Sequence, residues 1–245
     1  MAGKLNTLNI PSLFITGTDT GVGKTVVAAG IAAYLHAQGV DVGVMKPAET
    51  GCRTKGGELF PADAGLLMTA CRTDDVLGAV CPYCFSEPLA PAVAADRAGK
   101  KIDTRMLVKI YRALAREHET MLVEGAGGLM TPIHGKYLFI DLAAGLGLPV
   151  LIVGRTGLGT INHTLLTVEA ARSRGLKIHG IVLSHAVRAK PGVAEDTNPA
   201  VIKELSGIDR VFTLPYIPGA KRGRAGMLKA GAALWEQGFF GLTRN

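Results

Sequence analysis

The chain has 245 residues, of which 48% are hydrophobic and 5% aromatic, and its formal net charge is +7. This length and composition are sufficient for one α/β domain with a single large core. No uninterrupted apolar run reaches the roughly 18 residues of a membrane span, and residues 1–12 lack the apolar core of a signal peptide. We therefore expect a soluble cytoplasmic protein that contacts no membrane. The low aromatic content leaves no stacking platform for single-stranded nucleic acid.

Short apolar runs recur along the chain, with helix-like segments between them. The runs are SLFITG, DVGVMKP, TMLVEGAGG, LPVLIVG, KIHGIVLSH and RVFTLP. The segments expected to be helical are Lys24–Gln38, Thr104–Glu117, Thr160–Arg174, approximately Pro199–Ser206, and a carboxyl-terminal helix at about 225–237. This alternation predicts an α/β fold with a mostly parallel sheet and helices on both faces, whose strands end at one ligand-binding edge. The longest irregular stretch, Ala48–Pro61, is a candidate substrate loop at that edge.

The segment GTDTGVGKT, residues 17–25, joins the first predicted strand to the first predicted helix. A standard phosphate-binding loop reads G-x-x-x-x-G-K-[ST]. Here Thr18 stands where the first glycine belongs, and Gly17 precedes it by one position. The ending Gly-Lys-Thr nevertheless has the strand and helix flanks that a P-loop requires.

The end of this loop supplies the groups that bind a nucleoside triphosphate and its metal ion. Backbone amides of Gly21, Val22 and Gly23 can face phosphate oxygens, because glycine permits close approach. Lys24 is expected to reach the β- and γ-phosphates, and the Thr25 hydroxyl to coordinate Mg²⁺. The alternative is a glycine-rich turn that binds nothing.

Charged side chains follow the second and third predicted strands. Lys46, held before Pro47, would lie near the phosphates, although it could also be a surface lysine. Glu124 has the placement of a metal-linked carboxylate, and the glycines behind it leave room for a ligand. Asp63 could reach the same metal ion or simply belong to the start of a helix.

A second glycine-containing turn, GRTGLGTINHTLL, follows the fourth predicted strand. The free amides of Gly159, Thr160, Ile161 and Asn162 would form an anion site for a carboxylate or phosphate. The alternative is a helix that is merely capped by Thr160 or Asn162.

Two further clusters allow several interpretations. The CPYC segment, Cys81–Cys84, is either a coincidence of structure, a redox pair or part of a metal site. The basic segment GAKRGRAG contains Lys221, Arg222 and Arg224. It is either a solvated loop, a nucleic-acid contact or a lid near nucleotide phosphates.

The motifs GTDTGVGKT, KPAETG, PADAGLL, VEGAGG, GTINHTLL and PYIPG occur in an order and spacing that resemble ATP-dependent dethiobiotin synthetases. The resemblance covers about residues 12–220 of a single P-loop domain, expected over 1–245. The resemblance also implies that the early position of Gly17 is the form of the phosphate loop that is usual in this family. Partition ATPases of the same superfamily carry a lysine where this chain has Asp19, which argues against that alternative.

The resemblance implies a cyclo-ligase that converts 7,8-diaminononanoate, CO₂ and a nucleoside triphosphate to dethiobiotin. One amine captures CO₂ as a carbamate, which attacks the γ-phosphate, and the second amine then expels phosphate and closes the ring. Lys24 and Lys46 would be catalytic, with Mg²⁺ held by Thr25, Asp63 and Glu124. Thr20 and Thr50 would contact the diamine. The family is homodimeric, with the amides of residues 159–162 binding the substrate carboxylate across the interface.

Ser184 stands where the family's adenine-reading asparagine normally lies, which leaves the base preference open. The expected nucleotide-binding residues are Gly21, Val22, Gly23, Lys24, Thr25, Val26, Asp63, Glu124, Gly125, Ala126, Gly127, Ser184, His185, Pro215, Tyr216 and Ile217. The expected substrate-binding residues are Thr20, Lys46, Thr50, Gly159, Thr160, Ile161 and Asn162. A regulatory or partition-type ATPase without a diamine substrate is the alternative function. An amidotransferase-type relative would need a further domain for which 245 residues leave no room.

Overall fold

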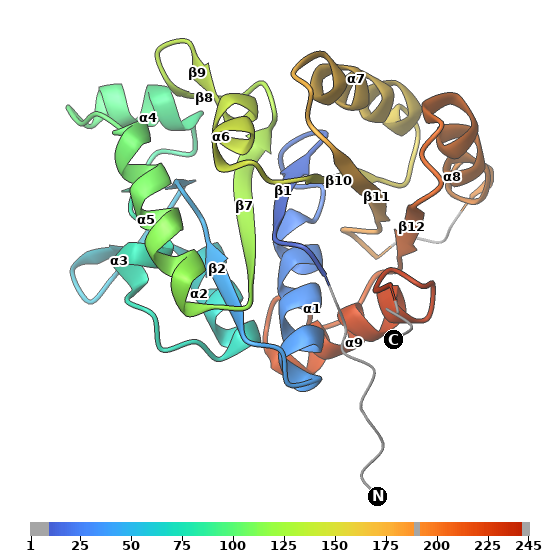
Figure 1. The fold of residues 1–245 in the computed structure, drawn as a ribbon, viewed down its shortest axis with the longest axis horizontal. Helices are drawn as coiled ribbons and strands as arrows, with labels where there is room; N and C mark the ends of the chain where they lie inside the picture. Colours follow the sequence, from blue (N-terminus) through green and yellow to red (C-terminus); the bar gives the residue numbers. More distant parts are fainter. Residues whose placement is uncertain (1–9, 189–191, 242–245) are drawn as a thin grey trace, which may run out of the picture.

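The computed structural model describes residues 10–188 and 192–241 (Figure 1). Most of residues 1–12, which we examined for the apolar core of a signal peptide, lies outside the described residues. Six strands form one sheet in the order β12-β11-β10-β1-β7-β2, and every neighbouring pair is parallel. These strands are β1 (Leu13–Gly17), β2 (Val42–Met45), β7 (Thr120–Gly128), β10 (Val150–Arg155), β11 (Ile178–Ser184) and β12 (Val211–Leu214). Each coincides with one of the six apolar runs, so the predicted parallel sheet is confirmed.

Helices cover both faces of this sheet (Figure 1). One face carries α1 (Lys24–Ala37), α2 (Ala62–Cys71), α3 (Leu77–Val80) and α9 (Arg224–Trp235). The other carries α4 (Pro91–Arg97), α5 (Thr104–Glu117), α6 (Phe139–Leu146), α7 (Thr160–Ser173) and α8 (Val193–Ser206). Side chains of β1 alternate between the two cores, because Leu13 and Ile15 pack on the first and Phe14 on the second. Within the described residues, no helix is both long and apolar enough to cross a membrane.

Three pairs of short strands lie outside the central sheet. They are β3 (Glu49–Thr50) with β6 (Cys84–Phe85), β4 (Arg53–Lys55) with β5 (Glu58–Phe60), and β8 (Pro132–His134) with β9 (Tyr137–Leu138). The expectation that Ala48–Pro61 is irregular was therefore wrong. Its hairpin turns at Gly56 and Gly57, whose φ values of 62° and 88° suit glycine. Strands of two or three residues are too short to produce a visible alternation in the sequence.

Helix α8 begins earlier than the sequence suggested. We expected this helix over approximately Pro199–Ser206. The helix instead begins at Val193, and Pro199 lies inside it. The carboxylate of Glu195 accepts a hydrogen bond from the Gly192 amide at 2.9 Å, which stabilises this earlier start.

A half-buried histidine just after α5 contacts two loops, the one before β2 and the one between α2 and α3. The Nδ1 atom of His118 lies 2.9 Å from Asp41 Oδ1, and its Nε2 atom lies 3.0 Å from Asp75 Oδ2. Burial lowers the pKa of His118, but the two carboxylates raise it further, so the net shift is upward.

We expect this histidine to make folding stability depend on pH. Because the folded-state pKa exceeds the unfolded value of about 6.5, the stabilisation is complete below that value. It is lost as the pH rises through the folded-state pKa. Urea unfolding of the wild type and of His118→Gln from about pH 6 to about pH 8.5 should show a decline that only the wild type has. Parallel pH profiles for the two proteins would contradict the assignment.

Candidate active site

The loop between β1 and α1 adopts a conformation that three of its glycines permit. Gly21 and Gly23 have φ values of 75° and 102°, in the left-handed region. A Cβ atom on Gly23 would lie 2.6 Å from the hydroxyl of Ser184. A Cβ atom on Gly17 would lie 2.7 Å from Lys24 Nζ, so a side chain there would collide with the lysine that folds back along the loop. The displaced glycine therefore makes room for the ammonium of Lys24.

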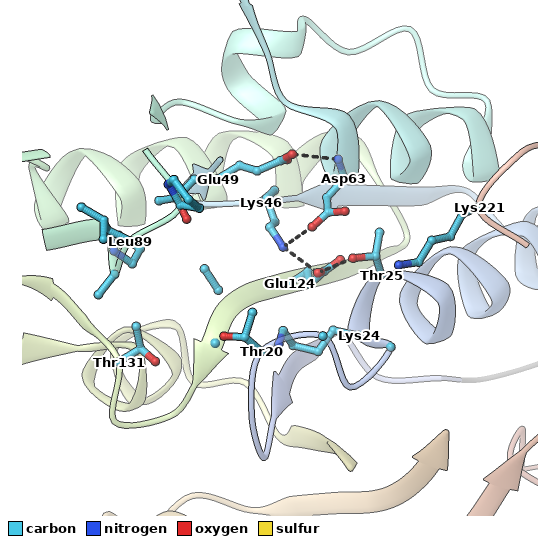
Figure 2. Close-up of a pocket in the computed structure, with 18 residues that line it drawn as sticks. Thr20, Lys24, Thr25, Lys46, Glu49, Asp63, Leu89, Glu124, Thr131 and Lys221 are labelled. Carbon is cyan, nitrogen blue, oxygen red and sulfur yellow. Dashed lines mark hydrogen bonds and ion pairs between the residues drawn. The ribbon is translucent and has the colours of Figure 1, made fainter. Parts of the chain in front are cut away.

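Lys46, Asp63, Glu124 and Thr25 form a connected group at the carboxyl edge of the sheet (Figure 2). Lys46 Nζ lies 2.6 Å from Glu124 Oε1 and 3.1 Å from Asp63 Oδ2. The Thr25 hydroxyl donates to Glu124 Oε1 at 2.9 Å. Pairing of β2 with β7 aligns Met45 with Val123, which brings the next residues, Lys46 and Glu124, together. Lys46 is only 3% exposed, so the alternative of a surface lysine was wrong.

The protonation of these groups follows from burial and from their neighbours. Burial lowers the pKa of Lys46, but Glu124 and Asp63 raise it further, and the net value lies above the usual range. Burial raises the pKa of Asp63, yet Lys46 lowers it further, so Asp63 stays ionised. Burial and the charge of Lys46 together lower the pKa of Lys24 to about 8. The site thus holds two lysines close enough to repel each other, an arrangement that a bound anion would stabilise.

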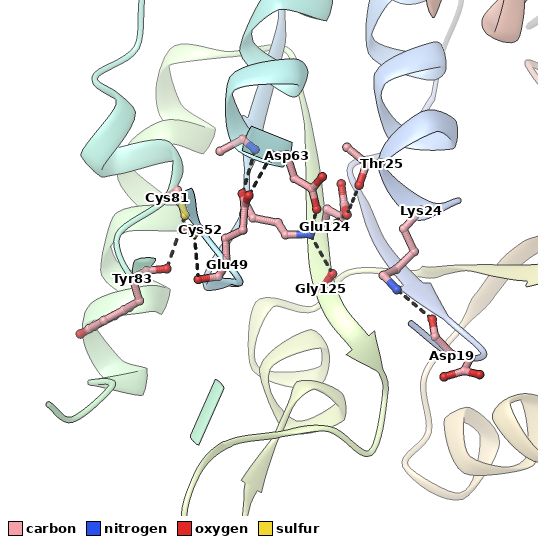
Figure 3. A network of polar contacts seen from close by, with 12 residues as sticks. Asp19, Lys24, Thr25, Glu49, Cys52, Asp63, Cys81, Tyr83, Glu124 and Gly125 are labelled. Carbon is pink, nitrogen blue, oxygen red and sulfur yellow. Dashed lines mark hydrogen bonds and ion pairs between the residues drawn. The ribbon is translucent and has the colours of Figure 1, made fainter. Parts of the chain in front are cut away.

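Glu49 orients this group, and the sequence did not reveal it. Its Oε1 and Oε2 atoms accept hydrogen bonds from the amides of Asp63 at 2.9 Å and Ala64 at 3.1 Å (Figure 3). These amides belong to the first turn of α2, where a carboxylate is favoured. Asp63 does lie at a helix start, as one alternative proposed, and it also contacts Lys46. An acidic residue just after a strand end, in KPAETG, was the available signal for Glu49.

A pocket of about 650 Å³ opens beside this group (Figure 2). It is lined by the predicted residues Thr20, Gly21, Gly23, Lys24, Thr25, Lys46, Thr50, Asp63, Glu124, Ala126 and Gly127. It is also lined by residues that we did not predict, namely Glu49, Pro88, Leu89, Ala90, Pro91 and Thr131, and by Lys221. Gly125, which was also predicted, does not line this pocket, but its carbonyl accepts a hydrogen bond from Lys46 Nζ at 3.4 Å. The volume is in the range of small-molecule sites.

A second pocket, of about 350 Å³, contains the residues that we expected near the base. Its walls include Val26, Ser184, His185, Pro215, Tyr216 and Ile217. Val22, in contrast, is 2% exposed and packs its side chain into the core, so only its backbone can contact a nucleotide.

The predicted anion site at the start of α7 lies apart from both pockets. None of Gly159, Thr160, Ile161 and Asn162, all within the described residues, lines either pocket. The expectation of four free amides was also wrong for Thr160, whose amide donates to Gly157 at 3.3 Å. Its hydroxyl donates to the Arg155 carbonyl at 2.6 Å, which closes the turn before the helix.

The oxygen atoms around Glu124 fit a Mg²⁺ ion. Glu124 Oε2 is buried and has no hydrogen-bond partner among the described residues. Such an orphaned carboxylate oxygen, with Asp63 and the Thr25 hydroxyl nearby, matches the hard oxygen ligands that Mg²⁺ prefers. The described residues contain no group of three or more His, Cys, Asp or Glu side chains that could hold a metal. Phosphate oxygens and water would therefore have to complete the coordination.

The four cysteines are free thiols, three of them buried and Cys84 half-buried. Cys81 Sγ lies 3.5 Å from the Tyr83 carbonyl, and burial raises its pKa (Figure 3). Burial likewise raises the pKa of Cys71 to about 11. Thiols with raised pKa values are poor nucleophiles, so the redox and metal interpretations of CPYC gain no support.

A strand–loop–helix phosphate cradle at the carboxyl edge of a parallel sheet, with a buried lysine and two carboxylates beside it, defines a P-loop nucleotide-binding protein. A ParA family ATPase from Chlorobium tepidum TLS has a similar fold, with a TM-score of 0.54, 14% identity and 93% of each chain covered. The family model described as an AAA domain matches residues 11–223.

Curated relatives define the family more narrowly. The ATP-dependent dethiobiotin synthetase of Anaeromyxobacter sp. (strain Fw109-5) is 48% identical, over 84% of this chain and 90% of its own length. That of Thermodesulfovibrio yellowstonii is 39% identical, over 87% and 92%. The chain belongs to the ATP-dependent dethiobiotin synthetase family.

Proposed function

We propose that this protein is a cytoplasmic cyclo-ligase of biotin biosynthesis, built as one domain, that converts 7,8-diaminononanoate, CO₂ and ATP to dethiobiotin. The observation that carries this proposal is the buried Lys46 ammonium between Glu124 and Asp63, beside the phosphate loop. A lysine held there can meet a carbamate oxygen and the γ-phosphate at once. Membership of the family supplies the identity of the diamine.

The residues act by placing positive charge where negative charge gathers. The carbamate, the triphosphate and the transferring phosphoryl group are all anionic, so positioned cations are the main requirement. Lys24 serves the phosphates from the start of α1, and Lys46 serves the carbamate and γ-phosphate from the end of β2. Thr25, Asp63 and Glu124 would hold Mg²⁺, which supplies further positive charge at the phosphates. Thr20 and Thr50 line the same pocket and orient the diamine.

The substrate carboxylate, in this proposal, binds a second copy of the chain. The start of α7, with Gly159, lies outside the pocket of its own chain. Exposed apolar side chains lie along this helix: Leu158, two residues before it, is 92% exposed, and Leu166 (61%) and Met130 (59%) line one small pocket beside α7. Contiguous exposed apolar residues are typical of interfaces, which supports a homodimer.

Product analysis tests the proposal. The purified protein is incubated with diaminononanoate, ATP, Mg²⁺ and isotopically labelled bicarbonate, and the products are identified by mass spectrometry. We expect dethiobiotin with one labelled carbon in its ureido ring and one ADP released for each ring formed. Formation of ADP without labelled dethiobiotin would refute the proposed reaction.

The base preference is expected to be weak. Ser184 is 3% exposed, at the junction of the phosphate loop and the second pocket. A serine hydroxyl offers one contact, whereas an asparagine can donate to and accept from adenine. We expect GTP or CTP to support catalysis within about two orders of magnitude of ATP, and Ser184→Asn to raise the preference for ATP by about 2- to 13-fold.

The measurement for this prediction is kcat/KM for three triphosphates with both proteins. An ATP preference above about 10³ in the wild type, far more than one neutral hydrogen bond supplies, would contradict it. So would an unchanged preference after the substitution.

A further inference from the structure

The pocket beside the phosphate loop and the second pocket have one lining residue in common among those that the structure describes. This residue is Lys221, in the loop between β12 and α9. Its side chain extends toward Thr25, as Figure 2 shows. Lys221 is exposed at the point where the two pockets meet. The basic segment that the sequence left unassigned therefore places one cation at this junction.

The charge of Lys221 is available to a ligand. No carboxylate of the described residues lies within ion-pair distance of its ammonium. A lysine directed into a polar pocket without a partner is suited to an anion.

The loop that carries Lys221 is fixed by short contacts. The Arg222 amide donates to the Gly219 carbonyl at 2.8 Å, and Ala220 is 5% exposed. A Cβ atom on Gly226 of α9 would lie 2.6 Å from the Gly219 carbonyl carbon, so only glycine allows this approach. The backbone on either side of Lys221 is thus held against α9.

Helix α9 is in turn held against the helix that begins with the phosphate-binding residues. A Cβ atom on Gly231 of α9 would collide with the Gly30 carbonyl oxygen of α1. This close approach ties the position of the Lys221 loop to α1 and hence to Lys24 and Thr25.

We propose that Lys221 binds the phosphate chain of the nucleotide, as a third cation beside Lys24 and Lys46. The inference rests on the proposed function, in which the base occupies the second pocket and the phosphates occupy the loop. A molecule bound in both pockets has to pass their junction, and the ammonium of Lys221 lies there. A lysine contributes to such a site as a point charge that makes charge-assisted hydrogen bonds.

Calorimetric titration with ATP, ADP, AMP and adenosine tests the proposal. The variants are Lys221→Ala, Lys221→Arg and the matched control Lys177→Ala, an exposed lysine just before β11 at the opposite edge of the sheet. We expect Lys221→Ala to weaken ATP and ADP binding about tenfold, the loss of one solvent-accessible charged hydrogen bond. Adenosine binding should be unchanged, Lys221→Arg should retain most of the affinity, and Lys177→Ala should behave as the wild type.

The pattern across the four ligands distinguishes phosphate binding by Lys221 from a purely structural role of its loop. Equal weakening of all four ligands by Lys221→Ala would indicate a distorted loop and overturn the proposal, as would unchanged ATP affinity. The titrations contain no diamine or bicarbonate. Failure to form dethiobiotin would therefore refute the proposed reaction without affecting the role of Lys221 in nucleotide binding. Unchanged ATP affinity of Lys221→Ala would refute that role without affecting the proposed reaction.

Discussion

Replacement of Lys46 by alanine is expected to lower the rate of dethiobiotin formation by about 10²–10³-fold. The ammonium lies 2.6 Å from Glu124 and faces the pocket that would hold the carbamate and γ-phosphate. Loss of a positioned charge in a water-excluded site removes stabilisation that the transition state needs most. The measurement is kcat for product formation at saturating ATP. Retention of more than about a tenth of the wild-type rate would exclude a central electrostatic role.

The same substitution has a structural consequence that the sequence did not indicate. From the sequence alone, Lys46→Ala is expected to leave folding and nucleotide binding nearly intact. The structure shows that Lys46 is the buried partner of Glu124, which is 1% exposed. Removal of one member of a buried pair can cost about 3–5 kcal/mol, although protonation of the remaining carboxyl relieves part of this. Lys46→Met, which fills more of the volume, and a thermal unfolding curve for each variant separate lost catalysis from lost folding.

Replacement of Glu124 by glutamine should have an effect of similar size for a different reason. The amide keeps the shape of the side chain but cannot neutralise Lys46, and it is a weaker ligand for Mg²⁺ than a carboxylate. We expect a loss in kcat of about 10²–10³-fold, with a higher Mg²⁺ concentration needed for the half-maximal rate. The free energy of unfolding should fall by up to about 3–5 kcal/mol.

Titration of the rate with Mg²⁺, together with urea unfolding, tests the role of Glu124. The matched control is Glu236→Gln, an exposed carboxylate just beyond α9, which should change neither quantity. If Glu124→Gln showed the wild-type dependence on Mg²⁺, Glu124 would not be a metal ligand and its orphaned Oε2 atom would not mark a metal site.

The sequence predicted the edge of the sheet at which the site lies but not the contacts within it. Lys46 and Glu124 each follow apolar runs, and the rules of parallel sheets bring such positions to one edge. Their direct contact depends on β7 lying beside β2, and strand order is set by long-range packing that no local pattern records. The sequence also could not explain why the first glycine of the loop, Gly17, stands one position earlier than in a standard P-loop. The explanation is a contact in the folded chain, because the side chain of Lys24 folds back against Gly17.

Glu49 escaped the sequence analysis, whereas Lys221 was identified only as one of three cations in a segment that allowed several interpretations. Glu49 caps a helix that begins more than ten positions further along the chain, at Ala62, so no capping motif is visible locally. Lys221 belongs to a run of three basic residues, and the sequence does not show which of their side chains faces the pocket beside the phosphate loop. The anion site predicted near Gly159 illustrates the opposite case, because its motif is clear in the sequence but its residues line neither of the two pockets.

Nucleotide turnover with and without the diamine tests the central claim most directly. ADP release is measured in the presence of ATP and Mg²⁺, with diaminononanoate and bicarbonate added together, singly or not at all. The account predicts rapid ADP release only when both are present, because the carbamate is the nucleophile that attacks the γ-phosphate. ATP hydrolysis at the same rate without the diamine would contradict it, and would indicate instead an ATPase that resembles the partition proteins in function as well as in fold.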